Sequence, residues 1–335
     1  MKLEKNIDVL VLGYYGFGNL GDELLAEAVV SNLVSAGVQK EKIVLLSADP
    51  QKSEARTGIK CYNRWNMGTV SALLKQSKSF LLGGGGLFQD VTSVKSCGYY
   101  WWIVRAAKMS GTKIWAVSQS VGPLKSMLGK WFTKNALKNC AYLSIRDRRS
   151  SALLDSMSVE GYKTTPDLAM GIQFAEKHCG GDTLLLNLRP GYGVAAENAL
   201  RIANFAAKRN KLKIIGVAFA REDQVYLENL QADDKIKLKD IVLCETAEVF
   251  EKMAVNASQA VGMRLHFAEL CALASLPAAM SAYDPKVEAF CEEWKLPVLT
   301  EKLSDEFAVV DSSKLQAARE KIVSEFRKGL TSVLQ

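Results

Sequence analysis

The chain has 335 residues, of which 48% are hydrophobic and 24% are charged. This length exceeds that of a usual single hydrophobic core and predicts two domains. The net charge of +7 suits anionic small molecules or an anionic membrane face. It falls short of the dense basic patches of nucleic-acid-binding proteins, so we expect no nucleic-acid partner.

The seven cysteines form no CxxC pair, which favours reduced thiols and argues against a disulfide framework or a structural zinc site. The first residues, Met1 to Asn6, contain no hydrophobic signal region, and no apolar run reaches transmembrane length. We therefore expect a cytoplasmic protein.

The first half of the chain alternates short apolar runs with amphipathic stretches, the pattern of βα units around a parallel sheet. The expected strands are 7–12, 43–47, 80–82, 114–117 and 142–145. The expected helices are 22–36, 99–109, 127–139 and 150–157. Together they predict a first Rossmann-like domain over residues 1–172.

A polar segment at 173–182 is the predicted linker, and a second alternating series follows it. Its expected strands are 183–188, 213–217 and 278–281, and its expected helices are 196–209, 247–255, 267–274 and 285–293. This series predicts a second Rossmann-like domain over 183–311, followed by a terminal amphipathic helix over 312–335. The expected α/β fold therefore has two Rossmann-like domains facing a central cleft. Such sheets bind ligands at the carboxyl ends of their strands, so the ligand site is expected in this cleft.

A glycine-rich loop follows the first expected strand and contains the pattern GxGxxG at Gly16, Gly18 and Gly21. A dinucleotide site is disfavoured, because Asp22 and Glu23 would repel a pyrophosphate at the helix start. Asp22 is expected to satisfy the helix N-terminus. Asn19 and Asp22 would then offer hydrogen bonds to a neutral ligand such as a sugar, and a tight turn without a ligand remains the alternative.

Four consecutive glycines, 83–86, end another expected strand and allow close approach of a ligand or a neighbouring loop. Gln89 and Asp90 follow them. The segment lacks the Gly-Lys-Ser/Thr ending of a nucleotide triphosphate loop. The aromatic run at 99–102 could stack on sugar rings or touch a membrane interface, but an interior position is favoured.

The segment 261–266, Val-Gly-Met-Arg-Leu-His, places one of only two histidines at the end of an apolar stretch, where a helix is expected to open. Arg264 offers a planar fork for a carboxylate or phosphate, and His266 is the side chain that exchanges protons near neutral pH. Together with free N–H groups at the helix start they form a candidate anion site with an acid beside it. A capping or interior histidine is the competing interpretation.

Seven motifs occur in chain order: GYYGFGNLGDE at 13–23, GGGLFQD at 84–90, QSVGPL at 119–124, SIRD at 144–147, NLRP at 187–190, GMRLH at 262–266 and YDPKV at 283–287. With them the chain resembles the polysaccharide pyruvyltransferase family, most closely its bacterial cell-wall type, CsaB. The resemblance implies a GT-B-like fold and transfer of a pyruvate ketal from phosphoenolpyruvate to a hexose. It also implies an acceptor that is a lipid-linked N-acetylmannosamine-containing precursor, with peripheral contact at the cytoplasmic membrane face.

Carried over residue by residue, the resemblance makes His266 the catalytic acid. It places phosphoenolpyruvate, a co-substrate, against the second domain, and no metal or cofactor is expected. The expected donor-binding residues are Arg264, Arg146, Arg189, Lys286 and Leu265. The expected acceptor-binding residues, on the first domain, are Gly16, Gly18, Asn19, Asp22, Gln89 and Asp90.

The chain departs from the family pattern at Glu269, where a small apolar residue is usual, and at Ala282. The group that accepts the hydroxyl proton is left open among Asp22, Asp90 and Glu222. A nucleotide-sugar-dependent glycosyltransferase of GT-B fold and a non-catalytic sugar-binding protein remain as alternative functions.

Overall fold

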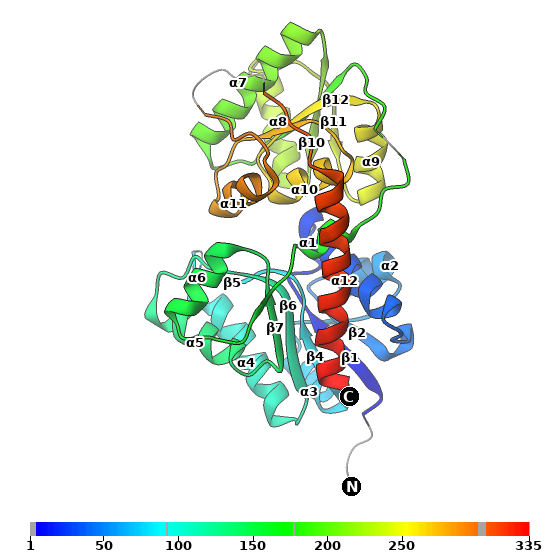
Figure 1. Cartoon of the computed structure of the whole chain (residues 1–335), viewed down its shortest axis with the longest axis vertical. Coiled ribbons are helices and arrows are strands. Elements are labelled where there is room, and N and C mark those ends of the chain that lie inside the picture. The colour runs from blue at the N-terminus through cyan, green and yellow to red at the C-terminus, as the bar shows by residue number, and fades with distance from the viewer. Residues whose placement is uncertain (1–4, 92, 177, 301–305, 335) are drawn as a thin grey trace. The chain divides into compact units, whose positions relative to one another are not determined.

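A computed structural model describes residues 5–91, 93–176, 178–300 and 306–334, and most of its elements are labelled in Figure 1. The chain divides into two compact units. Unit 1 comprises Met1–Phe17, Leu25–Gly171 and Ala318–Gln335, and unit 2 comprises Gly18–Leu24 and Ile172–Ala317. Residues 1–4 of the expected first domain, residue 177 of the expected linker and residues 301–305 of the expected second domain lie outside the described residues.

Unit 1 contains a parallel sheet whose strand order, in the described residues, is β3-β2-β1-β4-β6-β7-β8, with β5 paired to β6. Strands β1 and β4 at its centre are each buried at five of their six positions, as expected for parallel strands that are covered on both faces. The strands are β1 Ile7–Leu12, β2 Ile43–Ser47, β3 Lys60–Asn63, β4 Ser77–Leu82, β5 Gly85–Phe88, β6 Lys113–Val121, β7 Tyr142–Ile145 and β8 Lys163–Thr164.

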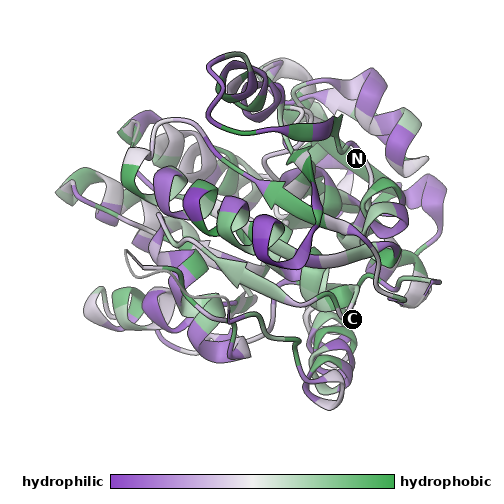
Figure 2. Ribbon diagram, turned by 90° about the horizontal axis from the view of Figure 1, so that it is seen from above, coloured by the Kyte–Doolittle hydropathy of each residue, from purple (hydrophilic) through white to green (hydrophobic). Residues whose placement is uncertain are grey.

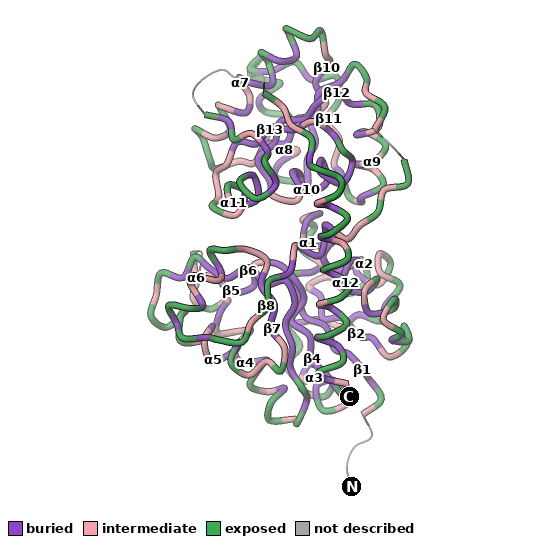
Figure 3. The backbone as a smooth tube through the Cα atoms, viewed as in Figure 1, coloured by how far each residue is buried: buried purple, intermediate pink, exposed green. Residues whose placement is uncertain are grey.

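The helices of unit 1 connect successive strands and bury their apolar faces against the sheet, whose strands are the most buried part of the unit (Figure 3). Several begin with a side-chain cap, such as Asp49, which accepts a hydrogen bond from the Lys52 N–H at the start of α2. The helices are α1 Leu20–Ser35, whose first turn belongs to unit 2, α2 Pro50–Thr57, α3 Met67–Gln76, α4 Val94–Met109, α5 Met127–Leu137 and α6 Arg148–Ser156, with short 3₁₀ segments at Lys40–Lys42 and Leu168–Gly171.

Unit 2 repeats the pattern with a smaller parallel sheet, ordered β11-β10-β9-β12-β13 in the described residues. Its strands are β9 Thr183–Asn187, β10 Lys213–Ala218, β11 Leu238–Leu243, β12 Ala257–Gly262 and β13 Ala278–Met280. Its helices are α7 Gly193–Asn210, α8 Arg221–Ala232, α9 Ala247–Val255, α10 Leu265–Leu273 and α11 Pro285–Trp294. Most helices alternate hydrophilic and hydrophobic bands along their length (Figure 2).

The terminal helix α12, Ser312–Leu334, matches the expected terminal amphipathic helix, although residue 335 lies outside the described residues. From Ala318 onward it belongs to unit 1. There Phe326 packs edge-on against Trp115 with ring centroids 5.3 Å apart, and Glu325 accepts a 2.7 Å hydrogen bond from the Tyr142 hydroxyl. The last helix therefore completes the packing of unit 1.

The α/β prediction is confirmed, and all nine expected helices and all eight expected strands occur, most of them with shifted ends. Within the described residues, eight further strands and α-helices were not predicted from the sequence. These are β3, β5, β8, β11 and β12 among the strands, and α2, α3 and α8 among the helices. Among the described residues, we find no helix with the length and apolarity needed to cross a membrane.

Candidate active site

Helix α10 begins directly after β12, two residues earlier than the sequence predicted, so His266 lies in its first turn. Arg264 precedes the helix in an extended conformation, and its backbone N–H donates to Asn187 Oδ1 over 3.1 Å. The Asn187 amide in turn donates to the Val217 carbonyl over 2.8 Å. Two neighbouring strands therefore fix the point at which α10 starts.

The guanidinium of Arg264 forms a two-point ion pair with Asp223. Its Nε donates to Oδ2 over 2.7 Å and its Nη2 to Oδ1 over 2.6 Å. Arg264 is 7% exposed and Asp223 is fully buried. The fork that the sequence predicted for a ligand anion therefore holds a protein carboxylate along one edge, and a guanidinium has a second edge formed by Nη1 and Nη2.

Asp223 was not identified from the sequence. It lies in the first turn of α8 and also accepts the Phe219 N–H over 3.1 Å. The neighbouring Glu222, one of the possible proton acceptors, places Oε1 3.5 Å from Arg264 Nη2. The available signal was the acidic pair at the start of α8, which was not recognised as the start of a helix.

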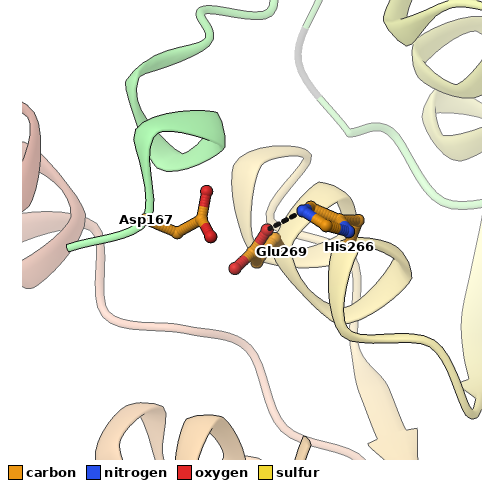
Figure 4. A group of neighbouring side chains, drawn as sticks. All are labelled: Asp167, His266 and Glu269. Atoms are coloured by element: carbon orange, nitrogen blue, oxygen red, sulfur yellow. Dashed lines mark ion pairs between the residues drawn. The ribbon is translucent and has the colours of Figure 1, made fainter. Parts of the chain in front are cut away.

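His266 and Glu269 point toward one another from successive turns of α10 (Figure 4), with Nε2 and Oε2 3.8 Å apart. Glu269 is 1% exposed. The departure from the family pattern at Glu269 thus places a buried carboxylate beside the candidate acid. The other histidine, His178, bonds through Nε2 to the Ala257 carbonyl over 2.7 Å, which is a structural contact.

The imidazole of His266 lies against Gly21 in the first turn of α1. A Cβ atom at residue 21 would overlap Nδ1, Cγ and Cε1 of the ring. The third glycine of the GxGxxG pattern is therefore required by the histidine, and no pyrophosphate contact is needed to explain it.

Residues 18–24, which contain the rest of that turn, cluster with unit 2. The Leu20 N–H donates to the Phe219 carbonyl over 2.9 Å. The Asn19 amide donates to the Asp22 carboxylate, and the buried Glu23 accepts the Gly18 N–H over 3.3 Å. Gly18, Asn19 and Asp22 were expected on the first domain, but they lie in the same unit as His266, whereas Gly16 stays in unit 1.

The remaining expected donor residues, Arg189, Leu265 and Lys286, also belong to unit 2. Arg189 donates to the Tyr283 hydroxyl over 2.6 Å and its guanidinium lies 5.4 Å from the ring centroid of Tyr192. Burial raises the pKa of Tyr283 despite the adjacent Arg189. Leu265 is the first residue of α10, and Lys286 lies in the first turn of α11, where Asp284 accepts its backbone N–H over 2.9 Å.

Arg146 belongs to unit 1, whereas Arg264 belongs to unit 2. It follows β7, and its guanidinium pairs with the carboxylate of Asp167, both side chains being largely buried. The fork predicted for a ligand anion is here too in contact with a protein carboxylate.

Asp90, expected at the acceptor, binds the segment that leads into α5. Its carboxylate accepts the Lys125 N–H over 2.6 Å, the Ser126 N–H over 2.8 Å and the Ser126 hydroxyl over 2.6 Å. Burial alone would raise the pKa of Asp90, but these hydrogen bonds lower it below its usual value. Gln89 Oε1 accepts the Val91 N–H over 2.9 Å. The recorded contacts of both residues therefore stabilise the loop after β5.

The four-glycine run allows close approach of other protein segments: a Cβ at Gly83 would overlap Tyr15, and one at Gly84 would contact Leu25 and Leu168. The aromatic run after it is partly interior. Tyr100 is buried and accepts a 3.0 Å hydrogen bond from Arg64, whereas Trp102 is 40% exposed. Arg64, missed by the sequence analysis, is 1% exposed at the end of β3 and also donates to the Gly13 carbonyl over 2.6 Å.

The sequence pattern of a known family covers most of this architecture. The family described as polysaccharide pyruvyl transferase matches residues 19–285, a range that includes Asn19, Asp223, Arg264, His266 and Tyr283. The chain belongs to the polysaccharide pyruvyl transferase family. The match supports a transferase, and the family prediction is confirmed.

Solved structures with the same fold are distant in sequence. A UDP-GlcNAc 2-epimerase from Methanocaldococcus jannaschii is 11% identical, with a TM-score of 0.58, over 94% of this chain and 92% of that one. A putative UDP-N-acetylglucosamine 2-epimerase from Listeria monocytogenes is 10% identical, with a TM-score of 0.60, over 98% and 90%. The UDP-GlcNAc 2-epimerase from Neisseria meningitidis bound to UDP-GlcNAc is 11% identical, with a TM-score of 0.54, over 96% and 100%. At these identities the similarity shows a GT-B-like fold alone, and no functionally curated protein matches the sequence of this pyruvyl transferase family member.

Proposed function

We propose that this member of the family transfers the pyruvyl unit of phosphoenolpyruvate to two hydroxyls of a hexose, forming a cyclic ketal and releasing phosphate. The observation that carries the proposal is the position of His266 in a chain of this family. Its ring lies against Gly21, its Nε2 is 3.8 Å from the Glu269 carboxylate, and Arg264 lies two residues earlier in the chain. A histidine held by a glycine on one side and near a buried carboxylate on the other has a defined orientation for proton transfer.

The donor needs positive groups for its carboxylate and its phosphate. We assign one of these anions to the second edge of Arg264, because Asp223 holds the first edge and thereby fixes the plane of the guanidinium. Arg189, Lys286 and the backbone at Leu265 complete the proposed donor site in unit 2. Arg146, paired with Asp167 in unit 1, keeps its donor assignment only from the family resemblance.

The chemistry begins with proton transfer from His266 to the methylene carbon of phosphoenolpyruvate, which becomes the methyl group. A sugar hydroxyl attacks the C2 carbon and loses its proton, and the C2–O bond to phosphate breaks. A second hydroxyl then attacks C2 and closes the ketal, and its proton restores the imidazolium. Glu269 favours the protonated imidazole, because a carboxylate 3.8 Å away stabilises the positive charge. No metal ion or organic cofactor enters this scheme.

We place the acceptor hydroxyls near Asn19 and Asp22, since this turn is in contact with the residue that delivers the proton. Asp22 is then the candidate proton acceptor, whereas the recorded contacts of Asp90 are structural. For the acceptor we propose a lipid-linked N-acetylmannosamine-containing cell-wall precursor, as in the CsaB type, handled at the cytoplasmic face of the membrane.

The test follows phosphate release from phosphoenolpyruvate with and without a synthetic N-acetylmannosaminyl acceptor, and identifies the ketal by mass spectrometry. Acceptor-dependent release with a ketal product supports the proposal. The similar solved structures named for UDP-GlcNAc enzymes suggest the rival to include, a nucleotide-sugar-dependent reaction on the same fold. Turnover of UDP-sugars without turnover of phosphoenolpyruvate would establish that rival, and sugar binding without any turnover would indicate a binding protein.

A further inference from the structure

The charges of unit 1 are unevenly distributed along the chain. Residues 91–146 contain nine lysines and arginines and no aspartate or glutamate. Because the whole chain has a net charge of +7, acidic residues outnumber basic ones outside this segment. The segment includes α4 and α5, which pack against one another (Figure 1).

Helix α5 exposes large apolar side chains on the face that points away from the protein. Its inward face consists of Gly129, Thr133, Ala136 and Leu137, all buried. On the opposite face Met127 is 88% exposed, Leu128 50% and Trp131 49%. Met127 and Trp131 are four residues apart, and so they lie on one side of the helix.

Lysines surround these apolar side chains. Lys125, Lys130 and Lys138 are exposed, and Lys134 is half-buried one turn beyond Lys130. Arg105 of α4 lies over Trp101, whose ring centroid is 5.4 Å from that of Trp131. We call the surface formed by Met127, Leu128, Trp131 and these lysines the α5 face.

The start of α5 is firmly held. Asp90 bonds both Lys125 and Ser126, and Ser126 caps the helix by accepting the Gly129 N–H over 2.9 Å. A Cβ at Gly129 would lie 2.6 Å from Asp90 Oδ2, so this close approach needs glycine. The α5 face is therefore a preformed surface attached to the loop at Gln89 and Asp90.

We propose that the α5 face binds the surface of a bilayer that contains anionic lipids. Tryptophan, methionine and leucine enter the interface between headgroups and acyl chains, and lysines around them attract the lipid phosphates. Charge complementarity selects this occupant: a second copy of the α5 face would bring lysines against lysines, whereas a bilayer with anionic lipids presents phosphates to all of them. This inference rests on the proposed function in one respect: a lipid-linked acceptor would lie in the same membrane.

Flotation of the full-length protein with vesicles tests the proposal. We expect binding to phosphatidylcholine vesicles that contain phosphatidylglycerol, little binding to phosphatidylcholine alone, and release by salt. Lys130→Gln with Lys134→Gln, and separately Met127→Ser with Trp131→Ala, should each weaken binding by about tenfold or more. Matched controls elsewhere are Lys40→Gln with Lys75→Gln, both exposed, and Val194→Ser, which is 67% exposed in the wild type.

Equal binding to both kinds of vesicle, or wild-type binding by both α5 variants, would overturn the proposal. Loss of dimers in the Met127/Trp131 variant without vesicle binding by the wild type would identify a second copy as the occupant, and RNA binding without vesicle binding would identify nucleic acid. Phosphate release with a lipid-free acceptor should be unchanged in the α5 variants. If the wild type shows no such release, the proposed function fails while the vesicle result stands independently.

Discussion

His266 packs its imidazole ring into the space that a side chain on Gly21 would fill. The two residues are 245 positions apart, and yet the first turn of α1 and the first turn of α10 meet within unit 2. The glycine thus sets the position of the candidate acid, and substitutions at residue 21 should act through His266.

Gly21→Ala should lower turnover by about tenfold to a hundredfold, because displacement of a catalytic group by about 1 Å has effects of this size. Phosphoenolpyruvate affinity, measured by calorimetry, should change only a few fold. Gly68→Ala is the matched control, since Gly68 is also the second residue of a helix and its added Cβ would meet Asn66 Oδ1 at an ordinary 3.5 Å. Wild-type turnover in Gly21→Ala would show that the imidazole position is unimportant.

His266→Gln should reduce the rate of phosphate release by about 10²–10⁴, the usual effect of losing a general acid, and leave donor binding largely intact. Glu269→Gln should shift the high-pH limb of the rate profile to lower pH, because the imidazolium loses a stabilising carboxylate. Stopped-flow phosphate release across a pH series measures both. An unchanged profile in Glu269→Gln would separate Glu269 from the acid.

Arg264→Lys should lose most of the donor affinity that Arg264→Ala loses, because lysine cannot form two parallel hydrogen bonds. Each charge-assisted hydrogen bond is worth about 1.5–3 kcal/mol, or about tenfold in affinity or more. Arg264→Ala should also destabilise the fold by about 3–5 kcal/mol, because it leaves the buried Asp223 carboxylate without its partner.

Asp223→Asn separates these two effects. It should weaken donor binding while it destabilises the fold less than Arg264→Ala, because asparagine can still accept a hydrogen bond from the guanidinium and Glu222 Oε1 remains 3.5 Å from Nη2. Melting temperatures and donor titrations of the three variants provide the comparison. Donor affinity equal to wild type in Arg264→Lys would make Arg264 a structural residue alone.

Asn19→Ala and Asp22→Asn should raise the KM for the acceptor by about tenfold, the effect of one lost hydrogen bond to a polar ligand, with donor affinity unchanged. Asn32→Ala is a control on the same helix, where the side chain donates only to the Ala28 carbonyl. A large loss of donor affinity in Asn19→Ala or Asp22→Asn would assign this turn to phosphoenolpyruvate.

Asp90→Asn should lower the melting temperature at neutral pH and have a smaller effect in acid. The pKa of Asp90 is below its usual value in the folded protein, so its stabilising contribution is present above the unfolded-state pKa and lost as the pH falls through the folded-state pKa. Thermal melts from neutral to acidic pH should therefore converge for wild type and Asp90→Asn. A constant difference at all pH values would exclude the carboxylate as the cause.

The sequence by itself determined the α/β class, the ends of β1, β2, β7 and α9, and, to within two residues, the start of α10. These follow from local periodicity and from turn residues, which act within a few positions of the chain. Elements such as β12, with polar residues among small ones, and β5, which begins with two glycines, form because neighbouring strands bond to them. The periodicity of a segment's own residues does not predict hydrogen bonds from neighbouring strands.

Only the tertiary structure decided what the site residues contact. Arg264 and Asp90 were each assigned to a ligand from the pattern, and each contacts protein: the carboxylate of Asp223 and the turn before α5. Gly21, the third glycine of the GxGxxG pattern, lies against the ring of His266. The reason is physical. A sequence shows that a residue can bond an anion, a hydroxyl or a close neighbour. A protein group that folding brings to the same place competes for that bond, and its position depends on contacts between segments that are distant in the chain.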